Sequence, residues 1–428
     1  MKNNTNTIIL MTLAVLASAP VFAAGDPAPL TLTLELSESL ALGKSPAVVA
    51  AQEREKAARR RVLPAYMPND PMIMVERAGQ VDSPLNWRGA TSEMWMVEEQ
   101  FRFPGKSLSE AGQLKAEARK AGAESDDVKR NILLQARQAY WDFYYRSRVD
   151  AILKDTEAQW RTLSTLFKTR DLTGQWASVK AVKTQVDLAR ALNERIAASK
   201  SLRVSESNLD HLFDAPDGTR YVLGDPSPAL PLTITQEQAI RSALGRSPMI
   251  AAASAMNDAA RSMKRTAVLE HLPDFTVRAY GMRMPGSSGF EDYGMRVGVS
   301  VPLFFPFKQT QGAREASAAF AASSADLADS RLLAIHDVEE AWVEADSAWQ
   351  LLKSYEDANL AGQLKKAWEA SRVAYRNEQM PASDFIETYN MYLETLTEIH
   401  RARADYGKAL ARLEFAMGNT PEKGESHE

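Results

Sequence analysis

The heptapeptide Leu40-Ala-Leu-Gly-Lys-Ser-Pro46 returns in altered form as Ser242-Ala-Leu-Gly-Arg-Ser-Pro248 in the second half of the 428-residue chain. At the same offset, Gln138-Ala-Tyr140 has its counterpart in Glu340-Ala-Trp342. Because several unrelated landmarks keep one register, the sequence indicates an internal duplication. We expect a first repeat at residues 24–227, a second repeat at residues 228–420 and a flexible tail at residues 421–428.

Proline placement predicts a very long helix in each repeat. No proline lies between Pro104 and Pro216 or between Pro306 and Pro381, and both gaps are rich in good helix formers. One helix over residues 106–172 would reach roughly 100 Å at 1.5 Å per residue, a length found in elongated assemblies. Each repeat should therefore run helix, β-hairpin, long helix, tip and return helix. The first helices are expected at residues 36–62 and 236–269, and the tips near residue 174 and at residues 377–381.

The predicted hairpins consist of four short segments at residues 72–78, 92–103, 274–282 and 293–301. In the last of these, Tyr293, Met295 and Val297 alternate with Gly294, Arg296 and Gly298. Alternation with a period of two indicates a sheet with one apolar and one polar face.

Four strands per chain are too few to close a membrane barrel, since the smallest such barrels have about eight. Open strand edges are not tolerated in lipid, so membrane insertion would require several chains to share one barrel. The alternative is a pair of soluble hairpins that pack on the helices.

The N-terminal residues are typical of an export signal. Lys2 supplies a positive charge, residues 8–19 are apolar, and Val21-Phe22-Ala23 suits a cleavage site, so we expect a signal peptide at residues 1–23. The apolar run is too short to span a bilayer as a helix.

Composition excludes several classes of function. The formal charge of −4 argues against nucleic acid as a partner, and the absence of cysteine excludes disulfides, thiol catalysis and cysteine-based metal sites. The chain has no Gly-x-Ser-x-Gly, phosphate-loop or His-Glu-x-x-His motif. We therefore expect no enzymatic activity and no cofactor.

The order of these features resembles the TolC family of outer-membrane efflux proteins. The resemblance is carried by the duplicated heptapeptide, by the strand ends Phe103-Pro104 and Val301-Pro302-Leu303-Phe304, and by the tip segments at residues 167–180 and 375–387. It covers nearly the whole chain after the signal peptide. The length and the missing N-terminal cysteine resemble the branch that exports cobalt, zinc and cadmium or copper and silver.

The resemblance implies a mainly α fold with a small β part. Each chain would contribute four strands to a trimeric, 12-stranded transmembrane β-barrel in the Gram-negative outer membrane, and a long α-helical coiled-coil tunnel would extend into the periplasm. The partners would be two further copies of the chain, outer-membrane lipid, a periplasmic adaptor protein and an inner-membrane pump of the RND type.

The second tip carries the predicted gate. Asp384 and Glu387 are three residues apart on a predicted helix and so share one face, and the family's acidic gate positions correspond to these two residues. The alternative is an ordinary solvated first turn, where acidic residues are favoured in any case. The adaptor is expected to contact the tips at Gly174, Gln175, Asn377, Gln379 and Met380, which could instead serve only as turn residues.

Methionines are concentrated in and beside the predicted strands, at Met72, Met74, Met94, Met96, Met282, Met284 and Met295. Thioethers are soft ligands that suit Cu(I) or Ag(I), and Met282 and Met284 are the candidates for lumen ligands. The alternative is that these methionines pack against lipid or a neighbouring chain.

The resemblance therefore implies the exit duct of a tripartite efflux system, and the similarity to the cation-exporting branch implies that it passes heavy-metal cations. The first alternative is the same channel exporting drugs or other small organic molecules. The second is a soluble periplasmic coiled-coil adaptor or scaffold.

Overall fold

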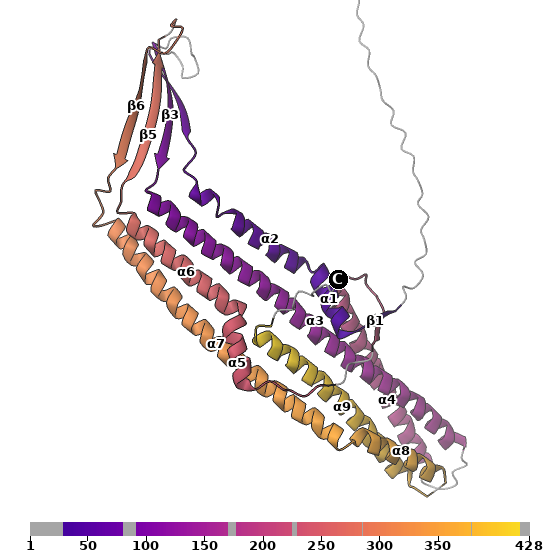
Figure 1. Cartoon of the computed structure of the whole chain (residues 1–428). Coiled ribbons are helices and arrows are strands. Elements are labelled where there is room, and N and C mark those ends of the chain that lie inside the picture. Colours follow the sequence, from indigo (N-terminus) through magenta and orange to yellow (C-terminus); the bar gives the residue numbers. More distant parts are fainter. Residues whose placement is uncertain are drawn as a thin grey trace, which may run out of the picture.

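A computed structural model shows an elongated molecule with a small sheet at one end and helical hairpins at the other (Figure 1). The structure describes residues 29–79, 91–169, 177–224, 229–284, 286–377 and 379–419. The predicted signal peptide and the predicted C-terminal tail lie outside this part of the chain.

The order of elements repeats along the chain. The first half contains β1 (Leu30–Leu32), α1 (Leu34–Lys44), α2 (Pro46–Arg60), a 3₁₀ turn (Pro64–Tyr66), β2 (Met72–Ala78), β3 (Ser92–Phe101), α3 (Pro104–Thr169), α4 (Ala177–Phe213) and β4 (Tyr221–Leu223). The second half contains α5 (Gln236–Arg246), α6 (Pro248–Leu269), β5 (Asp274–Arg283), β6 (Asp292–Ser300), α7 (Gln309–Asp357), α8 (Leu360–Arg376) and α9 (Ala382–Ala416). Two helices, two strands and long helices follow one another in both halves, which confirms the internal duplication.

The expected first helix of each repeat is wrong in one respect, because the structure divides it. The division falls at Ser45-Pro46 in one repeat and at Ser247-Pro248 in the other, with proline starting the second helix each time. Proline lacks the N–H that a helix interior needs but fits the first turn, so it ends one helix and begins the next.

The long helices differ between the repeats. Helix α3 is continuous over 66 residues, as the proline-free span predicts. The corresponding span of the second repeat is divided between α7 and α8 at Asn359, whose φ of 46° is left-handed. Asparagine is one of the few residues that adopts this conformation readily.

The four predicted strands are present and form one antiparallel sheet in the order β2-β3-β5-β6. Strand β3 of the first hairpin pairs with β5 of the second along nine residue pairs, from Glu93↔Arg283 to Phe101↔Phe275. The two repeats therefore contribute equally to a single sheet.

A second, two-stranded sheet was not predicted. Strand β1 pairs in parallel with β4, which lies close to the expected boundary between the two repeats. The buried Tyr221 of β4 donates a hydrogen bond of 2.7 Å from its hydroxyl to Asp210 Oδ1 of α4. This small sheet ties the start of the chain to the end of the first repeat.

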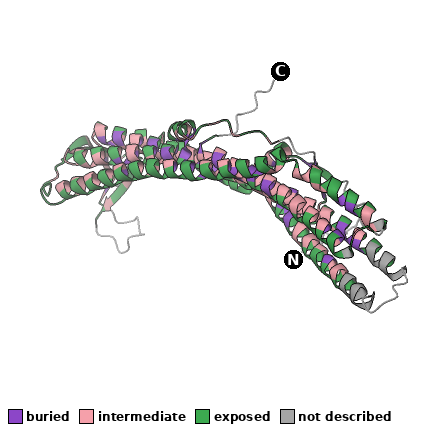
Figure 2. Ribbon diagram, turned by 90° about the horizontal axis from the view of Figure 1, so that it is seen from below, coloured by how far each residue is buried: buried purple, intermediate pink, exposed green. Residues whose placement is uncertain are grey.

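The helices pack along seams rather than around one core (Figure 2). In the first repeat Tyr140 is buried with Phe143, Leu209 and other apolar residues. In the second, Trp342 packs against the corresponding cluster and donates a hydrogen bond of 3.0 Å to the Ile234 carbonyl. The landmarks that revealed the duplication thus mark equivalent packing positions.

Among the described residues, no helix has both the length and the apolar character needed to cross a membrane.

Candidate functional site

The ladder register sorts the strand side chains onto two chemically different faces. One face, the apolar face, carries Ile73, Val75, Trp95, Val97, Ala279, Tyr293, Met295 and Val297. The opposite, polar face carries Met74, Glu76, Met94, Met96, Glu98, Arg278, Tyr280, Met282 and Arg296. Since alternate residues of a strand point to opposite sides, each strand contributes to both faces.

Several side chains of the two faces differ in exposure. On the apolar face Ile73 is 69% exposed and Val297 64% exposed, whereas Met74, Met94, Met96 and Met282 on the polar face are only partly exposed. These four methionines are therefore more shielded by their neighbours than Ile73 and Val297 are. Most of the large apolar side chains on the apolar face are exposed.

Several charged groups on the two faces are paired. On the polar face Arg278 Nε donates to Glu98 Oε2 at 2.8 Å, and the Arg296 guanidinium lies 4.9 Å from the centre of the Tyr280 ring. On the apolar face Glu93 binds Arg77 at 3.2 Å and Arg283 at 3.1 Å, at the end of the sheet farthest from the helices. The charges of Arg77, Glu93 and Arg283 therefore mark one limit of the apolar face.

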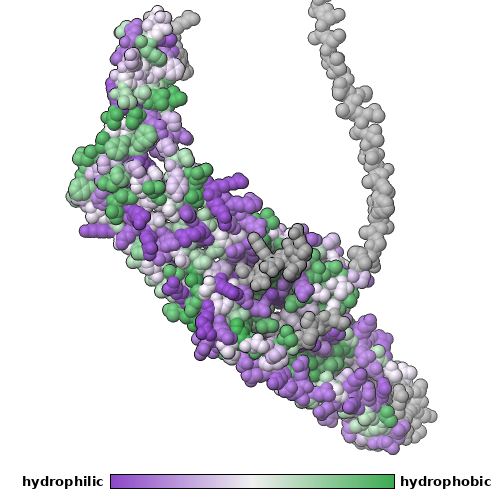
Figure 3. Space-filling view, in the orientation of Figure 1, coloured by the Kyte–Doolittle hydropathy of each residue, from purple (hydrophilic) through white to green (hydrophobic). Residues whose placement is uncertain are grey.

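The opposite limit lies where the sheet meets the helices. Hydrophobic surface gathers over this part of the molecule (Figure 3). The segment after β6 adds the exposed residues Leu303, Phe304, Phe305 and Phe307. Trp87, one of the aromatic residues beside the predicted strands, lies outside the described residues.

The junction between sheet and helices contains a buried lysine that sequence reasoning missed. Lys106, at the start of α3, has a side chain that is 2% exposed. Its ammonium lies 2.9 Å from both the Leu272 carbonyl and Asp274 Oδ1, and the Phe103 N–H donates to the same carboxylate oxygen at 2.9 Å. This network fixes the entry of β5 against the exit of β3.

The second tip lies at the other end of the molecule, between α8 and α9. Pro381 caps α9, and Asp384 and Glu387 are exposed in its first two turns, while Phe385 and Tyr389 on the opposite side are buried. Asp384 accepts a hydrogen bond of 2.8 Å from the Ser383 hydroxyl.

The residues predicted to contact an adaptor lie near this turn. Asn377 and Gln379 are exposed and Met380 is partly buried, whereas Gly174 and Gln175 of the first tip lie outside the described residues.

An aromatic cluster holds the second tip together. The Phe385 ring stacks on Tyr375 at a centroid distance of 4.8 Å and lies 4.9 Å from Trp368. Tyr389 lies 4.4 Å from Trp368 on one side and 6.4 Å from Trp160 of α3 on the other. Because Trp160 belongs to the first repeat, this cluster joins both helical hairpins close to their tips.

Buried charge also joins the helices of the first hairpin. Glu157 of α3 binds Arg195 of α4 and accepts a hydrogen bond of 2.7 Å from Arg161. The guanidinium groups of Arg195 and Arg161 hold the pKa of the Glu157 carboxyl below its ordinary value. The pair stays ionised at neutral pH and crosslinks α3 to α4.

A neutral histidine lies within the helical body. His400 Nδ1 of α9 lies 2.9 Å from the hydroxyl of the buried Tyr144 of α3. Burial, with help from the nearby Arg148 and Arg403, lowers the pKa of His400 to about 4. Its role is structural at neutral pH, because the uncharged ring fits between these helices.

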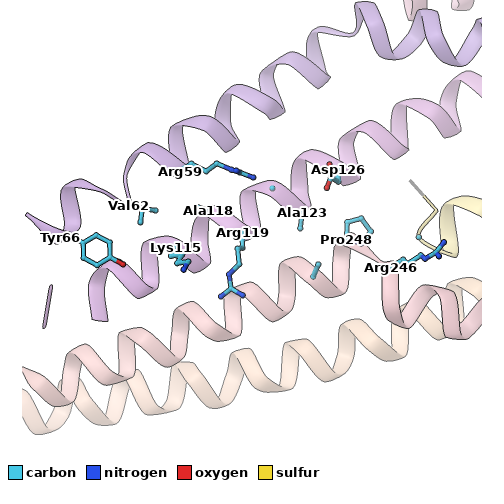
Figure 4. A pocket seen from close by; sticks show the side chains of 13 residues that line it. Arg59, Val62, Tyr66, Lys115, Ala118, Arg119, Ala123, Asp126, Arg246 and Pro248 are labelled. Atoms are coloured by element: carbon cyan, nitrogen blue, oxygen red, sulfur yellow. The ribbon is translucent and has the colours of Figure 1, made fainter. Parts of the chain in front are cut away.

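A groove of about 1050 Å³ runs between α2, α3 and α6 (Figure 4). Two of its cations have acidic neighbours: Arg59 lies 2.6 Å from Glu55, and Arg119 lies 2.9 Å from Asp258. In the described part of the chain, no three His, Asp or Glu side chains converge as they would around a metal ion.

A comparison with known protein families agrees with the architecture described above, in which an amphipathic sheet is joined to a long helical body. Residues 239–419 match the outer membrane efflux protein family, and the internal duplication extends the same architecture to the first half. This match covers the second half of the chain. Among curated proteins, none matches its sequence significantly.

Solved structures share the fold over nearly the full length. The outer membrane protein VceC from Vibrio cholerae is 16% identical with a TM-score of 0.75, covering 90% of this chain and 96% of VceC. A membrane protein from Pseudomonas aeruginosa is 15% identical with a TM-score of 0.78, covering 97% of this chain and 98% of its own. CusC, described in the context of folding and transmembrane channel formation, is 13% identical with a TM-score of 0.75, covering 93% and 96% of the two chains.

The two candidate lumen methionines lie in different surroundings. Met282 belongs to β5 and faces the polar side of the sheet, opposite Met94 of β3. Met284 lies after the last residue of β5 and is exposed. The pairing of Met282 with Met94 depends on the register between strands of different repeats, which the sequence alone does not supply.

Proposed function

We propose that this chain is one third of a homotrimeric channel that spans the outer membrane and crosses the periplasm. The observation that carries the proposal is the sheet, which has one apolar face, one polar face and two free edges. Within the described residues, β2 and β6 each pair with a single neighbour. Backbone groups at an open edge cannot be satisfied in lipid, so each β6 would pair with β2 of the next chain and close a 12-stranded barrel.

The dimensions of the apolar face support insertion into a membrane. From Phe101 to Trp95, β3 rises about 20 Å at 3.4 Å per residue, close to the roughly 25 Å apolar band of outer-membrane barrels. Glu93 and its two arginine partners would then lie at the external interface, where charge costs little. Phe304, Phe305 and Phe307 would lie at the periplasmic interface.

The helical body supplies the length of a periplasmic tunnel. Helix α3 alone, with 66 residues, extends about 100 Å. The sequence has no nucleotide-binding loop, so the driving force would come from an inner-membrane pump of the RND type, reached through an adaptor at the tips. In this scheme residues 1–23 are the signal peptide, residues 24–227 and 228–420 are the two repeats, and residues 421–428 are a flexible tail.

The tips would form the periplasmic gate. Asp384 and Glu387 are exposed on a turn that the aromatic cluster holds in place, so three chains would present six carboxylates around one opening. A ring of carboxylates favours cations and can constrict a pore. Gly174, Gln175, Asn377, Gln379 and Met380 are the proposed adaptor contacts.

The proposed cargo is heavy-metal cations, and the protein acts as a duct without catalysis. The alternative cargo is drugs or other small organic molecules, which the same architecture would pass. A soluble periplasmic scaffold is disfavoured by the exposed apolar face, because large exposed apolar patches mark membrane or protein contacts.

Two measurements test the channel and its cargo. Cell fractionation should place the protein in the outer membrane as a detergent-extracted trimer, and recovery as a soluble periplasmic protein would refute the channel. A deletion strain should become sensitive to Cu/Ag or Zn/Co/Cd salts. If the deletion strain is sensitive to hydrophobic drugs but tolerates metal salts normally, the cargo is organic molecules and not metal ions.

The gate is tested separately in planar lipid bilayers. Asp384→Asn/Glu387→Gln should raise the single-channel conductance and weaken cation selectivity, whereas Asp405→Asn, farther along α9, should change neither. Equal conductance in all three proteins would remove the gate assignment and leave the channel intact.

A further inference from the structure

Five of the six methionines in the described strands share one face of the sheet. Within the described strands, Met72, Met74, Met94, Met96 and Met282 all lie on the polar face, and Met295 lies on the apolar face. They come from three neighbouring strands of two different repeats. Their common face therefore follows from the pairing of the strands and not from proximity in sequence.

The register brings these side chains together as direct neighbours. Met74 lies opposite Met96, and in the next row of the same face Met94 lies opposite Met282. Residues directly opposite in antiparallel strands have Cβ atoms about 4.5–5.5 Å apart, a separation that two flexible thioethers can bridge to one ion. We call Met74, Met94, Met96 and Met282 the thioether patch.

The patch lies beside negative charge on the same face. Glu76 lies opposite Met94, and Asp292 lies opposite Met282, so one row across the sheet reads carboxylate, thioether, thioether, carboxylate. Nearby carboxylates attract a cation, and the neutral sulfurs bind it only if it is soft. The positive charge of Arg278, which lies on the same face one row beyond Tyr280, is bound to the Glu98 carboxylate.

Packing does not account for this distribution. The apolar face, which contacts lipid in the proposed channel, carries Ile, Val, Trp and Tyr. The positions of the polar face that are not methionine include Glu, Arg, Thr and Ser. Besides Ala78 and Tyr280, methionine is the apolar residue that the described strands place on the polar face. An apolar group on that side gains nothing from lipid, so a different interaction has to explain it.

We propose that the thioether patch binds soft monovalent cations, Cu(I) or Ag(I), on the inner wall of the barrel. The inference rests on the proposed channel, in which the polar face lines the lumen, and it narrows the cargo to this class of metal ion. Two thioethers per row would bind the ion weakly enough to release it outward, as conduction requires.

The test uses the full-length protein purified in detergent and Ag⁺, added as silver nitrate, as the probe. Binding is measured by calorimetry and by the silver retained after gel filtration. Wild-type protein should bind Ag⁺ but not Zn²⁺, and Met94→Leu/Met282→Leu should weaken Ag⁺ binding by about tenfold or more. Met295→Leu, an identical substitution on the apolar face, is the matched control and should bind as wild type does.

The outcomes separate this inference from the channel itself. Absence of Ag⁺ binding by wild-type protein, or equal binding by Met94→Leu/Met282→Leu and Met295→Leu, would overturn the thioether patch, while trimer formation and conductance would still support the channel. Conversely, a protein that never forms an outer-membrane trimer would refute the channel, whatever its affinity for silver. An unchanged trimer peak in gel filtration shows that the leucine variants are folded.

Discussion

Replacing Lys106 with methionine should loosen the junction between barrel and tunnel. The substitution keeps the length of the side chain but removes an ammonium that is 2% exposed and binds the Leu272 carbonyl and Asp274 Oδ1, each at 2.9 Å. Asp274 would keep only the Phe103 N–H on that oxygen, and the Leu272 carbonyl would lose its charged donor. The variant thus leaves a carboxylate and a carbonyl with fewer partners in a poorly hydrated place.

The size of the effect follows from these contacts. Removing one partner of a buried ion pair costs roughly 3–5 kcal/mol. The Asp274 side chain is 19% exposed, so water recovers part of that loss. The Lys106–Glu270 contact at 3.5 Å contributes little, because Glu270 is well exposed. We expect Lys106→Met to lower the free energy of unfolding by about 3 kcal/mol.

The assay is a urea titration of the detergent-solubilised protein followed by tryptophan fluorescence, with the amount of outer-membrane trimer as a second readout. A double-mutant cycle with Asp274→Asn isolates the pair. Lys106→Met should cost at least about 1.5 kcal/mol less when Asp274 has already been neutralised. A coupling energy below about 0.5 kcal/mol would refute the assignment of Lys106 as the partner that stabilises Asp274.

Two further predictions concern the helical body. The pKa of folded His400 is about 4, below its unfolded value, so the stability that neutral His400 contributes is complete above pH 6.5 and is lost as the pH falls toward 4. Over this range the free energy of unfolding of the wild type should fall by roughly 1–2 kcal/mol more than that of His400→Gln. Urea titrations at both pH values measure this difference. Gly407→Ala should destabilise α9 by about 1–3 kcal/mol, because the new Cβ would fall within 3.0 Å of the Trp141 indole. In a Trp141→Leu background the same change should stabilise by up to about 1 kcal/mol through helix propensity, and destabilisation in both backgrounds would contradict the clash.

The sequence predicted the periodic parts of the fold because their signals are local. Alternation was clearest in the fourth strand, and the absence of proline located α3. The division of the first helices carried a signal too, since Ser followed by Pro suits the start of a helix, but the expectation of one continuous helix overrode it. Lys106 carried no signal, because buried lysines are rare and this one depends on a partner from the other repeat.

The aromatic cluster at the tip could have been found. Trp368 and Tyr375 are seven residues apart, and Phe385 and Tyr389 are four apart, so each pair forms a stripe on one helix face. Two aromatic stripes on either side of a short turn predict that the helices pack face to face. The contribution of Trp160 is different, because only the tertiary fold brings the first repeat beside the second.

The methionines show where strand periodicity stops being informative. Alternation within β3 places Met94 and Met96 on one face of the sheet. It does not determine which residues of β5 lie on that same face. A shift of one residue between β3 and β5 would move Met282 to the opposite face from Met94 and would pair it with Glu93 or Trp95 instead. That shift would also separate Arg278 from Glu98 and Arg283 from Glu93, which are ion pairs on opposite faces. Two ion pairs on two faces therefore fix one register, and the same register brings the thioethers together.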